Sequence, residues 1–117
     1  MPCSTFLLKR DATLLVGHNL DDDIQVPGLV VADPRGVAKH NLSWDALRVG
    51  PFVKEPRLDW VSKYGSLTYC PMGREFPDGG LNEAGLYVGE MTLFGTRYPA
   101  DPALPKFYDR VWMQYLL

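Results

Sequence analysis

The sequence predicts a single α+β domain in which short strands joined by turns precede one helix. Glycine and proline are frequent, with 11 and 10 residues among 117, and they interrupt apolar runs that are too short for helices. Residues 106–117 differ, because Phe107, Val111 and Tyr115 fall on one stripe at helical spacing. A chain of this length can bury a core, so we expect one domain over residues 1–117.

Composition and charge exclude several classes of function. Hydrophobic residues make up 46% of the chain and charged residues 22%, which is typical of a soluble globular protein. The formal net charge is -2 without a block of like charges, so we expect no nucleic-acid partner. No apolar run approaches the roughly 20 residues of a membrane span, and no signal peptide is visible. We expect no membrane partner and a cytoplasmic location by default; whether the chain forms a homo-oligomer stays open.

The cysteines and histidines form no recognisable framework. Cys3 and Cys70 have neither a disulfide pattern nor metal-ligand spacing, and His18 and His40 are too few and too scattered for zinc. The sequence therefore predicts no metal and no cofactor. A bridge between the two cysteines, or a redox role for them, has no paired-cysteine motif to support it. We interpret Cys70 as structural.

The elements in chain order begin with two predicted hairpins and end with the helix. The run Leu14-Leu15-Val16 indicates a strand that is covered on both faces. Gly65 indicates a bulge or a close approach within a longer strand. The helix reaches Leu117 without a stop signal, so we expect the natural chain to continue. The predicted strands are residues 4–8, 13–16, 29–32, 37–40, 60–69 and 86–94, with turns at 9–12, 33–36 and 81–85, turn-rich sequence at 71–80, and irregular sequence at 41–59 that includes one helical turn at 43–47.

Cys3 is the first candidate for chemistry. If Met1 and Pro2 are removed, Cys3 acquires a free α-amino group, whose pKa is ordinarily about 7.7–8.0. That amine can take the thiol proton, so nucleophile and base belong to one residue. The competing interpretation is a cysteine buried as a small hydrophobe, which position alone favours.

Three other polar residues are candidates for the same site. Asp21 follows the second predicted strand, where a carboxylate can hold the terminal amine, although Asp22 and Asp23 are equally available and a solvated loop is the simpler interpretation. His18 can bind a substrate carboxylate or simply face solvent. Asn82 can donate an amide N–H to an oxyanion, or occupy its glycine-flanked turn for backbone reasons alone.

Further residues stay ambiguous at this level. Glu90 lies in an otherwise apolar predicted strand and either faces solvent or lines a pocket. Aromatic side chains can wall an apolar pocket or belong to an ordinary core: Trp44, Phe52, Trp60 and Tyr64.

Three motifs in order resemble one known family. They are Cys3-Ser4-Thr5-Phe6, Gly17-His18-Asn19-Leu20-Asp21 and Gly79-Gly80-Leu81-Asn82-Glu83-Ala84-Gly85-Leu86. Together they are similar to the choloylglycine hydrolase and penicillin V acylase family, the linear-amide C–N hydrolases of the N-terminal nucleophile superfamily. The final Val111-Trp112-Met113-Gln114-Tyr115-Leu116-Leu117 resembles the helix that follows in this family. Family members are longer, so residues 1–117 correspond to the N-terminal portion of their single domain.

The resemblance implies a four-layer αββα fold and a hydrolase that cleaves a linear amide. Cys3 would attack the amide carbonyl and form a thioester, Asp21 would hold the amino group of Cys3, and Asn82 would contribute to the oxyanion hole. His18 stands where the family usually has arginine, in the substrate-binding position. A further asparagine and arginine of the family's site would lie beyond Leu117. The alternatives are a truncated or degenerate non-catalytic relative and an acyltransferase on the same scaffold.

Overall fold

The computed structural model describes residues 3–42, 58–98, 101–104, 107–108 and 110–117. Within these residues the chain forms antiparallel sheets with little helix. The predicted helical turn at 43–47 and the aromatic residues Trp44 and Phe52 lie outside the described residues. The elements are β1 (Ser4–Arg10), β2 (Thr13–Asn19), β3 (Leu29–Asp33), β4 (Ala38–His40), β5 (Asp59–Val61), β6 (Ser66–Cys70), β7 (Gly79–Asn82), β8 (Tyr87–Gly89) and α2 (Val111–Leu116).

The first predicted hairpin is confirmed, and it is longer than expected. β1 and β2 pair antiparallel from Ser4 opposite Asn19 to Arg10 opposite Thr13. The turn is therefore short, and Asp11 takes a left-handed backbone conformation with φ of 53°, which aspartate tolerates better than most residues. The expectation of a strand covered on both faces is wrong, since Leu14 and Leu15 are 53% and 56% exposed. In the described residues these two strands pair only with each other.

The second predicted hairpin is wrong in its pairing. β3 pairs with β6 and β4 pairs with β5, so the chain forms a bent ribbon shared between two sheets. The predicted strand over residues 60–69 is accordingly split into β5 and β6. Ser62 holds the bend, because its hydroxyl donates to the Pro34 carbonyl at 3.2 Å and accepts from the Val37 N–H at 3.0 Å. The residues at 33–36 were predicted to reverse the chain in a hairpin, whereas in the structure they join β3 to β4 in two different sheets.

β7 was predicted as turn sequence, yet it is an inner strand of the sheet β3-β6-β7-β8. Glycine serves close packing here: a Cβ on Gly80 would lie 2.7 Å from both the Leu67 carbonyl oxygen and Leu117 Cδ1. The predicted strand over residues 86–94 is shorter in the structure, where β8 covers Tyr87–Gly89. Glycine signals a turn and a close approach equally well in sequence, and only the packed neighbours distinguish the two.

Replacing Gly80 with alanine is expected to lower the free energy of unfolding by about 1–3 kcal/mol, because the new methyl group overpacks the sheet against the C-terminal residue. The matched control is Gly65→Ala, whose Cβ would meet nothing closer than 3.4 Å. Urea unfolding followed by circular dichroism measures both. Equal stability of the two variants would contradict the close-approach explanation.

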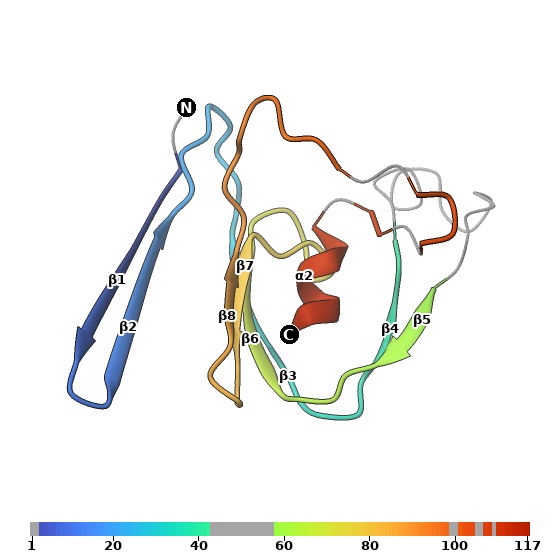
Figure 1. The fold of residues 1–117 in the computed structure, drawn as a ribbon, viewed down its shortest axis with the longest axis horizontal. Coiled ribbons are helices and arrows are strands. Elements are labelled where there is room, and N and C mark those ends of the chain that lie inside the picture. Colours follow the sequence, from blue (N-terminus) through green and yellow to red (C-terminus); the bar gives the residue numbers. More distant parts are fainter. Residues whose placement is uncertain (1–2, 43–57, 99–100, 105–106, 109) are drawn as a thin grey trace.

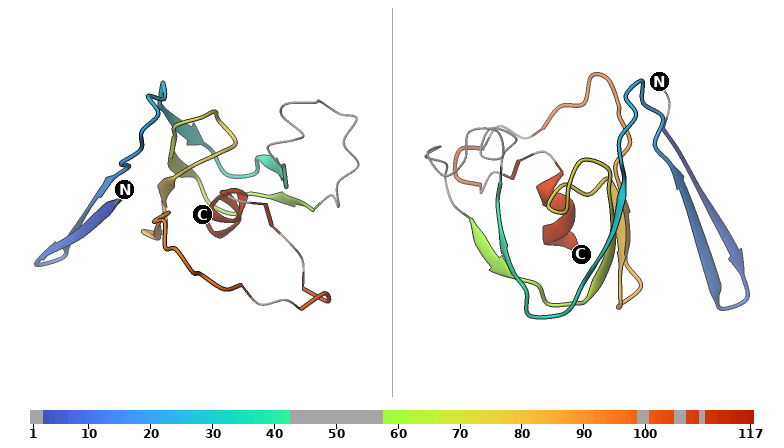
Figure 2. Two further views of the ribbon diagram at one scale, coloured as in Figure 1. Left: turned by 90° about the horizontal axis from the view of Figure 1, so that it is seen from above. Right: turned by 180° about the vertical axis from the view of Figure 1, so that it is seen from behind.

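The described elements lie in layers around the four-stranded sheet. The β1–β2 hairpin stands over one side of this sheet, and α2 covers the other side (Figures 1 and 2). Val111 and Met113 of α2 are at most 1% exposed. On the far side of α2, Tyr115 packs against Trp60 of β5 with ring centroids 5.6 Å apart. In the part of the chain that the structure describes, no helix is long and apolar enough to cross a membrane.

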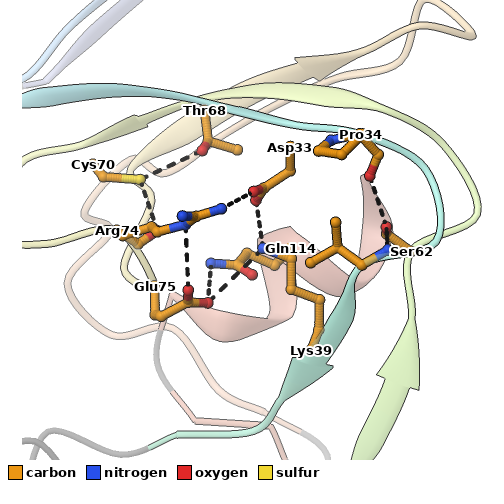
Figure 3. Close-up of polar contacts among 10 residues, drawn as sticks. Asp33, Pro34, Lys39, Ser62, Thr68, Cys70, Arg74, Glu75 and Gln114 are labelled. Carbon is orange, nitrogen blue, oxygen red and sulfur yellow. Dashed lines mark hydrogen bonds and ion pairs between the residues drawn. The ribbon is translucent and has the colours of Figure 1, made fainter.

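An ionic cluster around the buried Asp33–Lys39 pair links β3, β4 and α2 (Figure 3). Lys39 donates to Asp33 at 2.5 Å, and both side chains are at most 5% exposed. Arg74 donates to the second oxygen of Asp33 at 2.5 Å, while Gln114 of α2 donates to Glu75 at 3.4 Å. Burial by itself would raise the pKa of Asp33, but the hydrogen bonds and charges of Lys39 and Arg74 hold it below its ordinary value of 3.8. The cluster therefore requires an ionised Asp33.

Candidate active site

A polar pocket of about 50 Å³ lies where several strands and the helix begin or end. The register of the first hairpin places one wall of this pocket. Ser4 pairs with Asn19, so the residues just before β1 and just after β2 lie close together. A second wall comes from the β7–β8 hairpin, where the Glu90 N–H donates to the Asp78 carbonyl at 2.8 Å. The lining residues are Cys3, Leu20, Asp21, Asp22, Asp78, Glu90, Thr92 and Arg110.

Two predicted site residues meet in this pocket. Cys3 precedes β1 and is a partly buried free thiol, and Asp21 follows β2. Asp22 lines the same pocket. The sequence placed a carboxylate past the neighbouring strand, and the antiparallel register carries it to the thiol. The arrangement suits a carboxylate that holds an amine on residue 3.

Among the residues that line this pocket, Arg110 is the basic one. Its guanidinium contacts the Asp78 carboxylate and lies 3.4 Å from Glu90 Oε2, and its side chain is 13% exposed. Burial lowers the pKa of Arg110, while the charges of Asp22 and Cys3 raise it in opposition. The backbone of Arg110 is left-handed, with φ of 68°, a conformation that costs a non-glycine residue about 1 kcal/mol or more.

Asn82 is not brought to this pocket. Its side-chain carbonyl accepts from the N–H groups of Ala84 and Leu86 at 3.0 and 2.9 Å, and its amide donates to the Leu117 carbonyl at 3.1 Å. Asn82 ends β7, at the end of the β7–β8 hairpin away from Asp78 and Glu90. The side chain therefore shapes the turn and joins it to Leu117, the residue that follows α2, and its oxyanion role has no support from this geometry.

His18 lies beside the pocket rather than in it. Its Nδ1 and the Thr5 hydroxyl are 2.7 Å apart across the hairpin. Nε2 is buried, and within the described residues it has no hydrogen-bond partner. These contacts lie within the protein, so the binding of a substrate carboxylate by His18 stays a prediction.

A larger apolar pocket, of about 540 Å³, lies between β2 and the four-stranded sheet. Leu20 and Asp78 line both this pocket and the one that holds Cys3, so the two adjoin. Such a volume is ordinary for a small-molecule site. Its wall includes His18 and the Tyr87 side chain, whose hydroxyl is also buried and unpaired among the described residues. The other lining residues are Val16, Gly17, Val26, Gly28, Leu29, Val30, Tyr69, Cys70 and Pro71.

Cys70 behaves as the structural cysteine that we expected. It is 1% exposed, its thiol donates to the Arg74 carbonyl at 3.2 Å, and burial raises its pKa. Both cysteines are free thiols, so no bridge joins them. A buried thiol with a raised pKa is a poor nucleophile.

The sequence missed Asp78, Thr92 and Arg110, and only flagged Glu90 as an unusual charge in an apolar run. Asp78 stands in a turn-rich segment and Arg110 just before a helix, positions where charged residues are common.

Comparison of the chain with family models, curated proteins and solved structures finds no match. No group of three or more histidine, cysteine or acidic side chains in the described ranges is arranged to hold a metal ion.

Proposed function

We propose that this protein is a cysteine amidase that cleaves a linear amide through Cys3. The observation that carries the proposal is the shared pocket of Cys3 and Asp21. Once Met1 and Pro2 are removed, the α-amine takes the thiol proton and Asp21 holds that amine in place. The thiolate forms a bond to the amide carbonyl carbon, and collapse of the tetrahedral intermediate breaks the C–N bond as the amine leaves with the proton. Water then hydrolyses the thioester and restores the thiol.

The layered arrangement supports the same proposal. The N-terminal nucleophile fold has two stacked antiparallel sheets between helical layers, and here a hairpin, a four-stranded sheet and a helix follow one another in that order (Figure 1). We propose that residues 1–117 form the N-terminal portion of such an αββα domain.

The adjoining apolar pocket supports an acyl group of moderate size as the substrate. Its walls are mainly apolar, and it meets the Cys3 pocket at Leu20 and Asp78. An acyl chain in this pocket would leave its amide carbonyl beside Cys3. Penicillin V-type amides, N-acyl amino acids, N-acyl lactones and conjugated bile acids are the classes that we would offer first.

The test is to identify the acyl-enzyme. The purified chain is incubated with each amide, quenched in acid and analysed by intact mass and peptide mapping. We expect an added acyl mass on Cys3 in molecules that lack Met1 and Pro2. Turnover by a protein that retains Met1-Pro2, or acylation of another residue, would overturn the mechanism.

A non-catalytic relative is the second candidate, and two observations favour it. The pocket beside Cys3 has room for little more than a water or two, and the Asn82 amide is already occupied. Iodoacetamide distinguishes the candidates. A catalytic Cys3 is alkylated much faster than Cys70, whereas slow alkylation of both without turnover supports the non-catalytic protein. Transfer of the acyl group to an added amine would identify the acyltransferase variant.

A further inference from the structure

The pocket of Cys3 contains more negative than positive side chains, which disfavours a thiolate there. Four carboxylates line the pocket, two from the loop after β2 and two from the open end of the β7–β8 hairpin, and the Arg110 guanidinium lines it with them. A thiolate formed among these carboxylates is repelled by them. The α-ammonium that forms when the amine takes the thiol proton offsets part of this repulsion, and a fixed positive charge in the pocket would offset more of it.

Arg110 is placed to supply that charge. Its guanidinium contacts Asp78 and lies near Glu90, so it cannot swing out to solvent without leaving the Asp78 carboxylate buried and unpaired. Arg110 is the N-cap residue of α2, its backbone is left-handed, and its side chain lines the pocket. Cys3 and Asp22 line the same pocket as Arg110.

We propose that Arg110 is a positioning residue of this site, whose buried guanidinium offsets the surrounding carboxylates and so stabilises the thiolate of Cys3. The inference rests on the proposed function, in which Cys3 is the nucleophile. It adds a residue that lies more than a hundred positions from Cys3 in sequence and that the three family-like motifs do not contain.

The proposal is tested by the rate of iodoacetamide alkylation of Cys3 against pH, measured by peptide mapping so that Cys70 is followed separately. Arg110→Gln should slow alkylation at pH 7 by about tenfold and move the profile to higher pH, because a nearby cation commonly changes the ionisation of its neighbour by that order. Arg110→Lys, which keeps the charge, should stay within about threefold of the wild type. The matched control is Arg35→Gln, since Arg35 pairs with Glu83 at the β7–β8 turn, away from the pocket.

Glu90→Gln provides a test of opposite sign. It removes a negative charge from the pocket, so alkylation should become faster and the profile should move to lower pH. A folded Arg110→Gln variant with the wild-type profile would overturn the proposal. If that variant does not fold, an unchanged profile in Glu90→Gln would overturn it instead. Alkylation needs no amide substrate, so a protein that hydrolyses nothing but shows these shifts would refute only the proposed function.

Discussion

Replacing Cys3 with alanine is expected to lower amide hydrolysis by about a thousandfold or more, to the background of the uncatalysed reaction. The alanine variant has no atom that can form the thioester, so the loss appears in kcat rather than in substrate binding. Turnover of each amide substrate, measured by release of the free amine, gives the ratio.

The matched control is Cys70→Ser, which removes the other thiol. Cys70 is 1% exposed and lines the apolar pocket that we assign to the acyl group, so this variant should lose some stability and bind substrate more weakly. It keeps the Cys3 thiol that forms the thioester, so its kcat per folded molecule should be retained. Equal loss of activity in both variants would point to a structural effect. Full activity in Cys3→Ala would remove Cys3 from the mechanism altogether.

Replacing Asp33 with asparagine is expected to lower the free energy of unfolding at pH 7 by about 3 kcal/mol, because Lys39 then keeps a buried charge without its nearest partner. Lys39 is 5% exposed, and its next carboxylate, on Glu75, lies 3.9 Å away. Guanidinium unfolding measures the change. Asp59→Asn is the control, since the Asp59–His40 pair is about half exposed and such pairs contribute little.

The pH dependence of this variant has a definite sign. The folded pKa of Asp33 lies below its ordinary value of 3.8, so the ionised carboxylate stabilises the fold fully above about pH 4. As the pH falls below 3.8 and through the folded pKa, that contribution is lost. The difference between wild type and Asp33→Asn should therefore shrink as the solution is acidified below pH 4. A difference that is unchanged in acid would show that the charge of Asp33 is not its cause.

Local patterns in the sequence identified individual strands better than their partners. The first hairpin could be predicted because its strands are adjacent, with a two-residue turn between them. The bend at Ser62 could not, because a strand that continues into a second sheet has the same alternation as one that does not. β7 was hidden for a related reason: Gly79 and Gly80 mark turns far more often than they mark a strand that packs against a helix.

The candidate site divides in the same way. The sequence offered Cys3 together with Asp21, Asp22 or Asp23, and the family resemblance singled out Asp21. The register of the first hairpin brings the residue before β1 close to those after β2, and both Asp21 and Asp22 line the pocket of Cys3. Asp78, Glu90 and Arg110 come from segments that are distant in sequence, and only the tertiary fold brings the open end of the β7–β8 hairpin and the residue before α2 to the pocket that Cys3 lines. The structure also keeps Asn82 away from the Cys3 pocket, because its side chain makes its hydrogen bonds within its own turn and with Leu117. Residue identity and strand register are local properties, whereas the charge around a nucleophile is the sum of side chains from every element that reaches it.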